Sequence, residues 1–471
     1  MKKIVLICTI IIGIVLISLT AISKQVYDGD ELYSYTLSSS NTSGLMINNV
    51  KMDEWNSSKE IKKVFELNNN EVFNLISIYK NQASDVHPPF YYLIFHIISI
   101  FFLNTFTIIP GILLNIIAYI IGIIYLYKIS CEISNSKHNY IPCLLYTLSI
   151  GMISTSMFIR MYMLFTMFCL MFTYYFIKVF NKQDKHNLIK LGICTYFGFM
   201  THYFFLVYAF FISLLYLIYL LVTKKKLLNY IITMGSSVVI GFITFPFAYI
   251  HIFKGYRGNE TTENLVKSSF INNFKSIYDR LNQDVFYGIM IIILIGIVIL
   301  LIKLIRDKKS INYMNIIMTS TLLYFLLTLK IIPILSTRYF YSIYPIIILI
   351  IYYLIDRSIK NKYMKKSIVL ILLVLSIISK INYEPSWIGK TNATHKDINV
   401  VYVIDNDYNT ITDSQYLLNY NKVYYTRDFN DYSILDNNTI IMTSDLDVLN
   451  KVISNTNYSE YYEFDMGYKF R

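Results

Sequence analysis

The sequence predicts an all-α polytopic membrane protein with a small α/β domain at its C-terminal end. Hydrophobic residues make up 55% of the 471 residues and charged residues only 15%. The mean hydropathy of +0.47 is too high for a soluble protein of this length. Eleven apolar stretches each approach the length that crosses a bilayer. From Glu384 onward the pattern changes to short β-prone runs followed by acidic turns.

The eleven predicted transmembrane helices are identified by runs of about 20 apolar residues. They are placed at residues 4–22, 106–127, 141–158, 161–180, 188–201, 203–222, 228–252, 286–305, 311–332, 339–355 and 367–382. The basic start Met1-Lys2-Lys3 also fits a signal peptide. Because the first apolar run is long enough to span and shows no evident small-residue cleavage site, we interpret it as an uncleaved helix.

The twelfth apolar run, Phe90–Leu103, is too short for a confident span, at about 14 residues. Counting it as a crossing would put Lys224–Lys226 and the basic segment 357–366 outside, against the positive-inside tendency. We therefore interpret it as a helix that lies in the interface or re-enters the membrane. The basic loops then share the inner face, so the net charge of +12 reflects topology, and nucleic-acid binding is set aside.

This topology places all the polar segments that could take part in catalysis on the outer face of a plasma membrane. The transmembrane module covers residues 1–383, with a first external loop at 24–88 and a second at 254–285. Apolar residues at helical spacing in Ser57–Tyr79, and again in the second loop, predict helices on the bilayer surface.

The C-terminal tail, residues 384–471, is predicted to be an extracytoplasmic α/β domain. Strands are expected at 399–404 and 438–443, with a helix at 414–419 between them. The five cysteines lie in apolar segments or in an inner loop, so no disulfide framework is implied.

Three acids lie near the start of the first external loop, in Asp28-Gly29-Asp30-Glu31. A carboxylate at the membrane edge can remove the proton from an acceptor hydroxyl, which is the work of a general base. Asp30 and Glu31 are the candidates, and Asp28 competes with them because the sequence does not say which acid faces a cavity. The alternative is a solvated acidic turn above the bilayer.

The loop closes with Asp85-Val86-His87-Pro88-Pro89. The two prolines fix the backbone where the next helix begins, so they hold Asp85 and His87 in place. A plain stop between loop and helix is the alternative, but a stop needs no histidine. Phe90, Tyr91 and Tyr92 follow as an aromatic cluster suited to an interface.

Single cations interrupt the later apolar runs. Arg160, followed by Tyr162, and Arg338, followed by Tyr339, are costly there unless they reach lipid phosphate or bind an anion. A guanidinium fork suits phosphate oxygens, so both arginines are candidates for binding a lipid-linked phosphate. His202, followed by Tyr203, splits another run and is either a binding residue or an ordinary turn residue.

Metal and cofactor motifs are absent from the sequence. There is no cysteine pair and no His-x-x-x-His, and the acidic Asp28-Gly29-Asp30 is the one Asp-x-Asp outside the tail on the outer face. No glycine loop for phosphate and no Ser/His/Asp arrangement appears. A divalent metal is therefore left open without support from the sequence.

In order and spacing, these motifs resemble the polytopic glycosyltransferases of the GT-C fold. The similar group is the bacterial family 39, related to protein O-mannosyltransferases and to the aminoarabinose transferases of lipid A. The resemblance covers about residues 1 to 350, and each motif is weak alone. The matching positions are Asp30-Glu31, His87 to Tyr92, Arg160 with Tyr162, Thr201 to Tyr203, and Arg338-Tyr339 with Pro345.

The resemblance implies a sugar carried on a polyprenyl phosphate, inverting hexosyl or pentosyl transfer at the outer face, and Asp30 as the base. The acceptor would be a protein, lipid or polymer. Some relatives place a second acid just after the Arg-x-Tyr, where this chain has Met163-Leu164-Phe165. A mechanism that uses two acids would therefore need Asp85 or Glu31 in the role of that second acid.

Two other functions stay open at this point. One is a lipid or polysaccharide transporter or flippase without transferase activity. Such proteins are expected to show ionisable residues within spans or inverted repeats, and this chain shows little of either. The other is an inactive relative that only binds.

Overall fold

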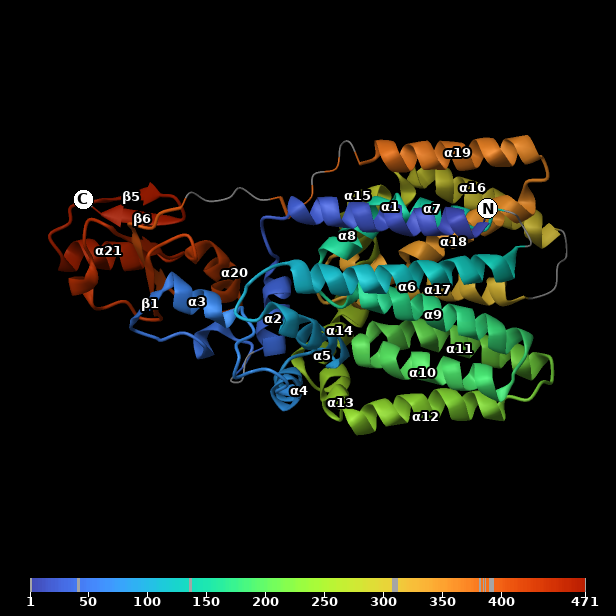
Figure 1. The fold of residues 1–471 in the computed structure, drawn as a ribbon, viewed down its shortest axis with the longest axis horizontal. Helices are drawn as coiled ribbons and strands as arrows, with labels where there is room; N and C mark the ends of the chain where they lie inside the picture. Colours follow the sequence, from blue (N-terminus) through green and yellow to red (C-terminus); the bar gives the residue numbers. More distant parts are fainter. Residues whose placement is uncertain are drawn as a thin grey trace. The chain divides into compact units, whose positions relative to one another are not determined.

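The computed structural model describes residues 2–39, 43–134, 138–306, 312–380, 383, 385, 387–388 and 394–470. Contacts divide the chain into two compact units. The helical unit contains Met1–Ile22, Val86–Tyr91 and Gly111–Pro385, and the α/β unit contains Ser23–Asp85, Tyr92–Pro110 and Ser386–Arg471. Figure 1 shows the elements of each unit along the chain.

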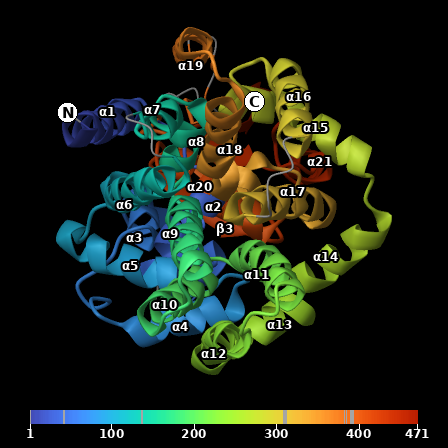
Figure 2. The same cartoon turned by 90° about the vertical axis from the view of Figure 1, so that its right-hand side faces the viewer.

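Each apolar stretch identified in the sequence contains helix. The helices of the helical unit are α1 (Lys2–Ile22), α6 (Ile109–Ile133), α7 (Ile141–Thr147), α8 (Ile150–Met157), α9 (Tyr162–Asn181), α10 (Lys185–Thr201), α11 (Phe204–Val222), α12 (Leu228–Thr244), α13 (Phe247–Phe253), α14 (Tyr256–Lys267), α15 (Phe270–Phe286), α16 (Met290–Arg306), α17 (Tyr313–Ile331), the 3-10 helix η3 (Thr337–Ile343), α18 (Tyr344–Ser358) and α19 (Lys362–Ile378). In Figure 2, where these helices are seen nearly end-on, α10 lies between α9 and α12.

By length and composition, the described helices include six that can cross a membrane, or up to eight if each of two bent pairs forms one span. The bent pairs turn by 104° after Thr244 and by 71° after Phe286. The stretch at 141–158 is two short helices, α7 and α8, rather than one. Several others are helices of 17 residues, so the number of eleven spans stays a prediction.

The run predicted to lie in the membrane interface forms α5 (Phe90–Ser99) and the one-turn η2 (Ile100–Phe102). This is a short apolar helix, below the length of a span. Phe90 packs its ring against Phe168 of α9 and Phe197 of α10, with ring centroids 6.0 and 4.7 Å away. The first turn of α5 is thereby fixed within the helical unit.

The α/β unit is built on a six-stranded sheet in the order β1-β3-β2-β4-β6-β5. Its elements are α2 (Gly29–Ser39), η1 (Met46–Asn48), β1 (Trp55–Ser57), α3 (Ser58–Val64), α4 (Leu75–Ser84), β2 (Asn399–Val403), α20 (Asp407–Leu417), β3 (Lys422–Thr426), η4 (Tyr432–Ile434), β4 (Thr439–Met442), α21 (Leu446–Asn455), β5 (Tyr461–Phe464) and β6 (Gly467–Phe470). The central strands β3, β2 and β4 are parallel.

Both faces of this sheet are covered. Val400 and Tyr402 of β2 face one buried cluster, which includes Leu32 of α2, and Val401 and Val403 face another. A parallel sheet buried on both faces explains why β2 reads as a continuous apolar run.

The largest departure from the sequence expectation is the origin of β1. This strand lies in the first external loop and pairs antiparallel with β3 of the tail, with Trp55 opposite Tyr424. The loop and the tail therefore form one unit, whereas the sequence analysis divided the chain at residue 384.

Two further segments of the α/β unit can be compared with expectation. Ser57–Tyr79, predicted to contain helices, contains α3, which starts at a capping box of Ser57 and Glu60, and the first residues of α4, which Asn74 caps. In the tail, α20 ends before the predicted helix does, and β3, β5 and β6 were not anticipated.

Candidate active site

Four basic side chains come together in the helical unit at the ends of different helices, and we call them the cation cluster: His87, Arg160, His202 and Arg338. Arg160 Nη2 donates to His87 Nδ1 at 3.4 Å. The rings of His87 and His202 have centroids 6.2 Å apart. Arg160 and His202 are only 3% and 4% exposed.

Local packing holds these side chains where helices begin and end. The turn before Arg160 is held by Asn115 of α6, whose amide donates to the carbonyls of Ser156 and Phe158 at 2.8 and 3.1 Å. The segment that carries Arg338 is held by Tyr324, whose hydroxyl donates to the Tyr339 carbonyl at 2.8 Å. The cations thus sit on rigid turns.

His202 presents a buried N–H donor. Its Nδ1 accepts a hydrogen bond from the Phe204 backbone N–H at 3.1 Å, so the ring proton belongs on Nε2. Among the described residues, that buried Nε2 has no hydrogen-bond partner. Burial lowers the pKa of His202 well below its usual value, and the charges of His87, Arg160 and Arg338 lower it further, so the ring is neutral.

Aromatic rings line the cation cluster. Phe165 stacks on His202 at 5.0 Å, and Tyr162 lies 5.4 Å from His202 and 6.2 Å from Tyr339. The Arg338 guanidinium lies over the Tyr339 ring at 5.6 Å. Such rings restrict the arginine and exclude water, which strengthens electrostatic contacts inside the cluster.

Tyr203 belongs to a different contact. Its hydroxyl lies 2.8 Å from His251 Nδ1 of α13, and its ring packs near Phe199 at 6.0 Å. The structure thus brings the predicted binding residues together except Tyr203, which joins α11 to α13.

One cation near the cluster escaped the sequence analysis. Arg257 of α14 lies close enough to Tyr339 for the tyrosine to influence it electrostatically. Its Nη1 pairs with Glu260 Oε2 at 2.7 Å. An arginine in a predicted external loop resembles any solvated loop charge, so no sequence pattern distinguishes Arg257 from its neighbours.

The predicted acids lie in the α/β unit, and adjacent acids differ in environment there. Glu31 is fully buried, pairs with Lys24 Nζ at 2.8 Å and accepts the Asp28 backbone N–H at 2.8 Å. It is therefore committed to holding the first turn of α2. Asp30, its neighbour, is half-buried, and its backbone N–H donates to Asp28 Oδ1 at 2.9 Å.

Asp30 and Asp85 both act electrostatically on one tyrosine, Tyr33. Burial raises the pKa of Tyr33, and Tyr408, Asp85, Asp407 and Asp30 raise it further. The acids from both edges of the first external loop are therefore within electrostatic reach of a single hydroxyl. The tail contributes Tyr408, whose ring stacks on Tyr33 at 5.7 Å, and this contribution was not foreseen.

A second buried polar group in the helical unit was also missed, and we call it the Asp284 cluster: Ser154, Arg280, Asp284, Tyr344 and Tyr383. Asp284 is fully buried, receives Arg280 Nε at 3.3 Å and accepts from the Ser154 and Tyr344 hydroxyls at 3.2 and 3.0 Å. Arg280 also donates to the Tyr383 hydroxyl. The only sequence signal is an Arg and an Asp at i and i+4 of a helix.

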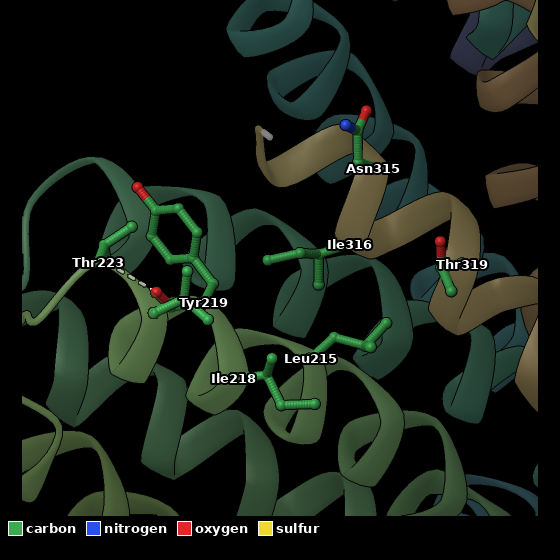
Figure 3. Close-up of a pocket in the computed structure, with 8 residues that line it drawn as sticks. Leu215, Ile218, Tyr219, Thr223, Asn315, Ile316 and Thr319 are labelled. Carbon is green, nitrogen blue, oxygen red and sulfur yellow. Dashed lines mark hydrogen bonds between the residues drawn. The ribbon is translucent and has the colours of Figure 1, made fainter. Parts of the chain in front are cut away.

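Among the described residues, no group of three or more His, Cys, Asp or Glu side chains could hold a metal ion. A cavity of about 560 Å³ lies between α11 and α17, lined by Tyr219, Thr223, Asn315, Thr319 and apolar side chains, as Figure 3 shows. It lies at the opposite end of α11 from His202 and contains no charged lining residue, so it is separate from the cation cluster.

Three comparisons show which known proteins this chain is similar to. Residues 86–250, which contain His87, Arg160 and His202, match the family model described as dolichyl-phosphate-mannose-protein mannosyltransferase. That match covers about a third of the chain. No curated protein sequence gives a significant match.

Two solved structures are similar to most of the chain, and the first of them supports the fold. The structure of ArnT from Cupriavidus metallidurans bound to undecaprenyl phosphate has a TM-score of 0.50 at 9% identity, covering 98% of this chain and 97% of that one. The apo oligosaccharyltransferase of Archaeoglobus fulgidus has a TM-score of 0.48 at 10% identity, and 90% of this chain covers 64% of its length. The expected fold is thus confirmed: this chain is a multi-pass membrane protein with the GT-C glycosyltransferase fold.

Proposed function

We propose that this protein is a glycosyltransferase that moves a sugar from a polyprenyl-phosphate donor to an acceptor hydroxyl at the outer face of the plasma membrane, with inversion. The observation that carries the proposal is the buried cation cluster, in which Arg160 and the unpartnered Nε2–H of His202 lie together. A buried N–H donor without a partner is costly unless an acceptor binds there, and the basic residues around His202 favour an anionic acceptor.

The phosphate of the donor is the anion that this cluster suits. When the bond between sugar and phosphate breaks, negative charge develops on the departing phosphate. Preorganised cations and N–H donors stabilise that charge more in the transition state than in the ground state. The match to a family described by a dolichyl-phosphate sugar, and the likeness to a structure holding undecaprenyl phosphate, support this donor class.

Asp30 is proposed as the general base. It would take the proton of the acceptor hydroxyl while that oxygen attacks the anomeric carbon and the phosphate leaves from the opposite side. Glu31 is engaged by Lys24 and the backbone of α2, which favours Asp30 for this role. Asp85 shares the surroundings of Tyr33 with Asp30 and is the second candidate.

The test uses the purified protein in nanodiscs with a panel of undecaprenyl-phosphate sugars and membrane acceptor extract. Asp30→Asn should abolish transfer while binding of undecaprenyl phosphate stays as in the unaltered protein, because the amide cannot take the proton. Asp436→Asn, at an exposed turn of the tail where the side chain caps the backbone, is the matched control. Unaltered transfer by Asp30→Asn would reject Asp30 as the base.

The same preparation separates a transferase from a transporter. A transferase releases undecaprenyl phosphate and a glycosylated acceptor in equal amounts. A flippase instead moves the labelled lipid between leaflets of a vesicle without changing it. Movement of intact lipid with no glycosylated product would overturn the proposed function.

A further inference from the structure

The C-terminal tail contacts the helix that carries Asp30 along its first turns. We propose that α20 of the tail is a positioning element for that helix, with Gln415 as its principal positioning residue. The inference rests on the proposed function, in which Asp30 is the base. All the contacts involved lie within the α/β unit.

The Gln415 side chain hydrogen-bonds to the backbone of Tyr27, just before α2 begins. Its side-chain oxygen accepts the Tyr27 backbone N–H at 2.9 Å, and its side-chain nitrogen donates to the Tyr27 carbonyl at 2.9 Å. The same nitrogen donates to the Thr412 carbonyl at 3.0 Å, which orients the amide. One side chain thus satisfies both backbone groups of a residue, as a neighbouring strand would, and fixes where α2 begins.

Gly29, the first residue of α2, shows how closely the two helices approach. A Cβ at this position would lie 2.4 Å from Thr412 Oγ1 and 2.9 Å from Tyr408 Oη. Contacts this short are not tolerated without displacement, so a larger residue would push α2 away from α20. The glycine therefore allows the helix start to rest directly on the tail.

A third contact lies one turn further on. Tyr33 stacks on Tyr408 with centroids 5.7 Å apart and planes at 22°. Asp30 lies between Gly29 and Tyr33 in the sequence, so its backbone is held on both sides by α20. The Lys24 pair with Glu31 braces the same turn.

Positioning of this kind acts on the rate of the chemical step. A base displaced by about 1 Å can lose about 100-fold in rate even when substrate binding is unchanged. Loosening α2 should therefore lower transfer at saturating donor and leave the affinity for undecaprenyl phosphate as it was, because the cation cluster is in the helical unit.

The first experiment compares Gln415→Ala with Asn409→Ala in the full-length protein in nanodiscs. Asn409 is exposed on the same helix, which makes it a matched amide control. Gln415→Ala should lower the maximal transfer rate by about 10- to 100-fold and speed hydrogen exchange of the backbone amides of residues 27–31. Gln415→Glu keeps an acceptor for the Tyr27 N–H and should recover part of the rate and of the protection.

The second experiment tests the close approach itself. Gly29→Ala should lower the rate like Gln415→Ala, although alanine is the better helix former. Removing the colliding atom in Gly29→Ala with Thr412→Ala should restore much of it, because Tyr408 is 45% exposed and can turn aside. A merely destabilising effect of the alanine would not be repaired by a second truncation.

The outcomes separate the two proposals. If Asp30→Asn leaves transfer unchanged, the proposed base is wrong. If Asp30→Asn abolishes transfer while Gln415→Ala and Gly29→Ala match Asn409→Ala in rate and in hydrogen exchange, the positioning role of α20 is overturned. Faster exchange at residues 27–31 with an unchanged rate would also overturn it, since α2 would then move without consequence for the chemistry.

Discussion

The two buried polar groups of the helical unit differ in the charged residues that act on their most buried member. In the Asp284 cluster, the carboxylate pairs with Arg280 and accepts from two hydroxyl groups. Its charge and its hydrogen-bonding capacity are therefore satisfied within the cluster. In the cation cluster, the charged groups that act on His202 are His87, Arg160 and Arg338, all basic. The His202 Nε2 is a buried donor without a partner among the described residues.

Under the proposed function, this difference separates a structural site, the Asp284 cluster, from a proposed binding site, the cation cluster. A buried ion pair with complete hydrogen bonding costs little to keep and is costly to break. A buried set of cations is instead stabilised when an anion arrives. Substitutions in the Asp284 cluster should therefore change stability, and substitutions in the cation cluster should change affinity for a lipid phosphate.

The largest effect is expected for Asp284→Ala, which leaves Arg280 without its carboxylate. The loss should be about 3–5 kcal/mol of unfolding free energy, seen as a lower Tm in nanodiscs. Asp279→Ala is the control, because Asp279 is exposed on the same helix. Arg280→Leu combined with Asp284→Leu should lose less than Asp284→Ala. Equal Tm values for Asp284→Ala and the control would break the comparison.

Next in size is the effect of Arg160→Ala on affinity. Loss of a buried cation facing phosphate should weaken undecaprenyl phosphate binding by about 30-fold or more, measured by titration in nanodiscs, with little change in Tm. Arg357→Ala is the control, since Arg357 is exposed at the far end of α18. A large fall in Tm with unaltered affinity would show that Arg160 stabilises the fold and does not bind the phosphate.

A finer test separates the two nitrogens of His202. His202→Asn keeps an acceptor for the Phe204 N–H but removes the Nε2 donor, whereas His202→Gln supplies a donor near the Nε2 position. His202→Asn should weaken undecaprenyl phosphate binding by about 10-fold, and His202→Gln should weaken it by less. If the two variants bind alike, the Nε2–H does not contact the phosphate.

The smallest effect is expected for Tyr203→Phe. The Tyr203 hydroxyl bonds to His251 rather than to the cation cluster, so undecaprenyl phosphate binding should change by less than about 2-fold. A small fall in Tm from the lost hydrogen bond is expected instead. A change in affinity as large as that of His202→Asn would place Tyr203 in the binding site.

Sequence reasoning located the cation cluster because single charges are conspicuous in apolar surroundings. Arg160, His202 and Arg338 each interrupt a long hydrophobic run, and that rarity marked them. Arg280 and Asp284 were missed because they lie in the predicted second external loop. Charged residues are common in such loops, and the local sequence does not show that these two are buried. The same reason hid Arg257.

The helices were predictable and the sheet was only partly so. Long apolar runs specify helical spans by composition alone, whereas β1 has three residues and no periodicity. Its pairing with β3 joins residues more than 360 positions apart, and no local pattern encodes a contact at that distance. The merging of the first external loop with the tail could therefore not be read from the sequence.

The pairing of Trp55 with Tyr424 also imposes an order on biogenesis. The ribosome completes the first external loop long before it makes β3 and α20, so the edge strand and the turn ahead of α2 have no lasting partners during most of translation. Loss of β3 and α20 would therefore act at a distance in the sequence, on residues that are made much earlier.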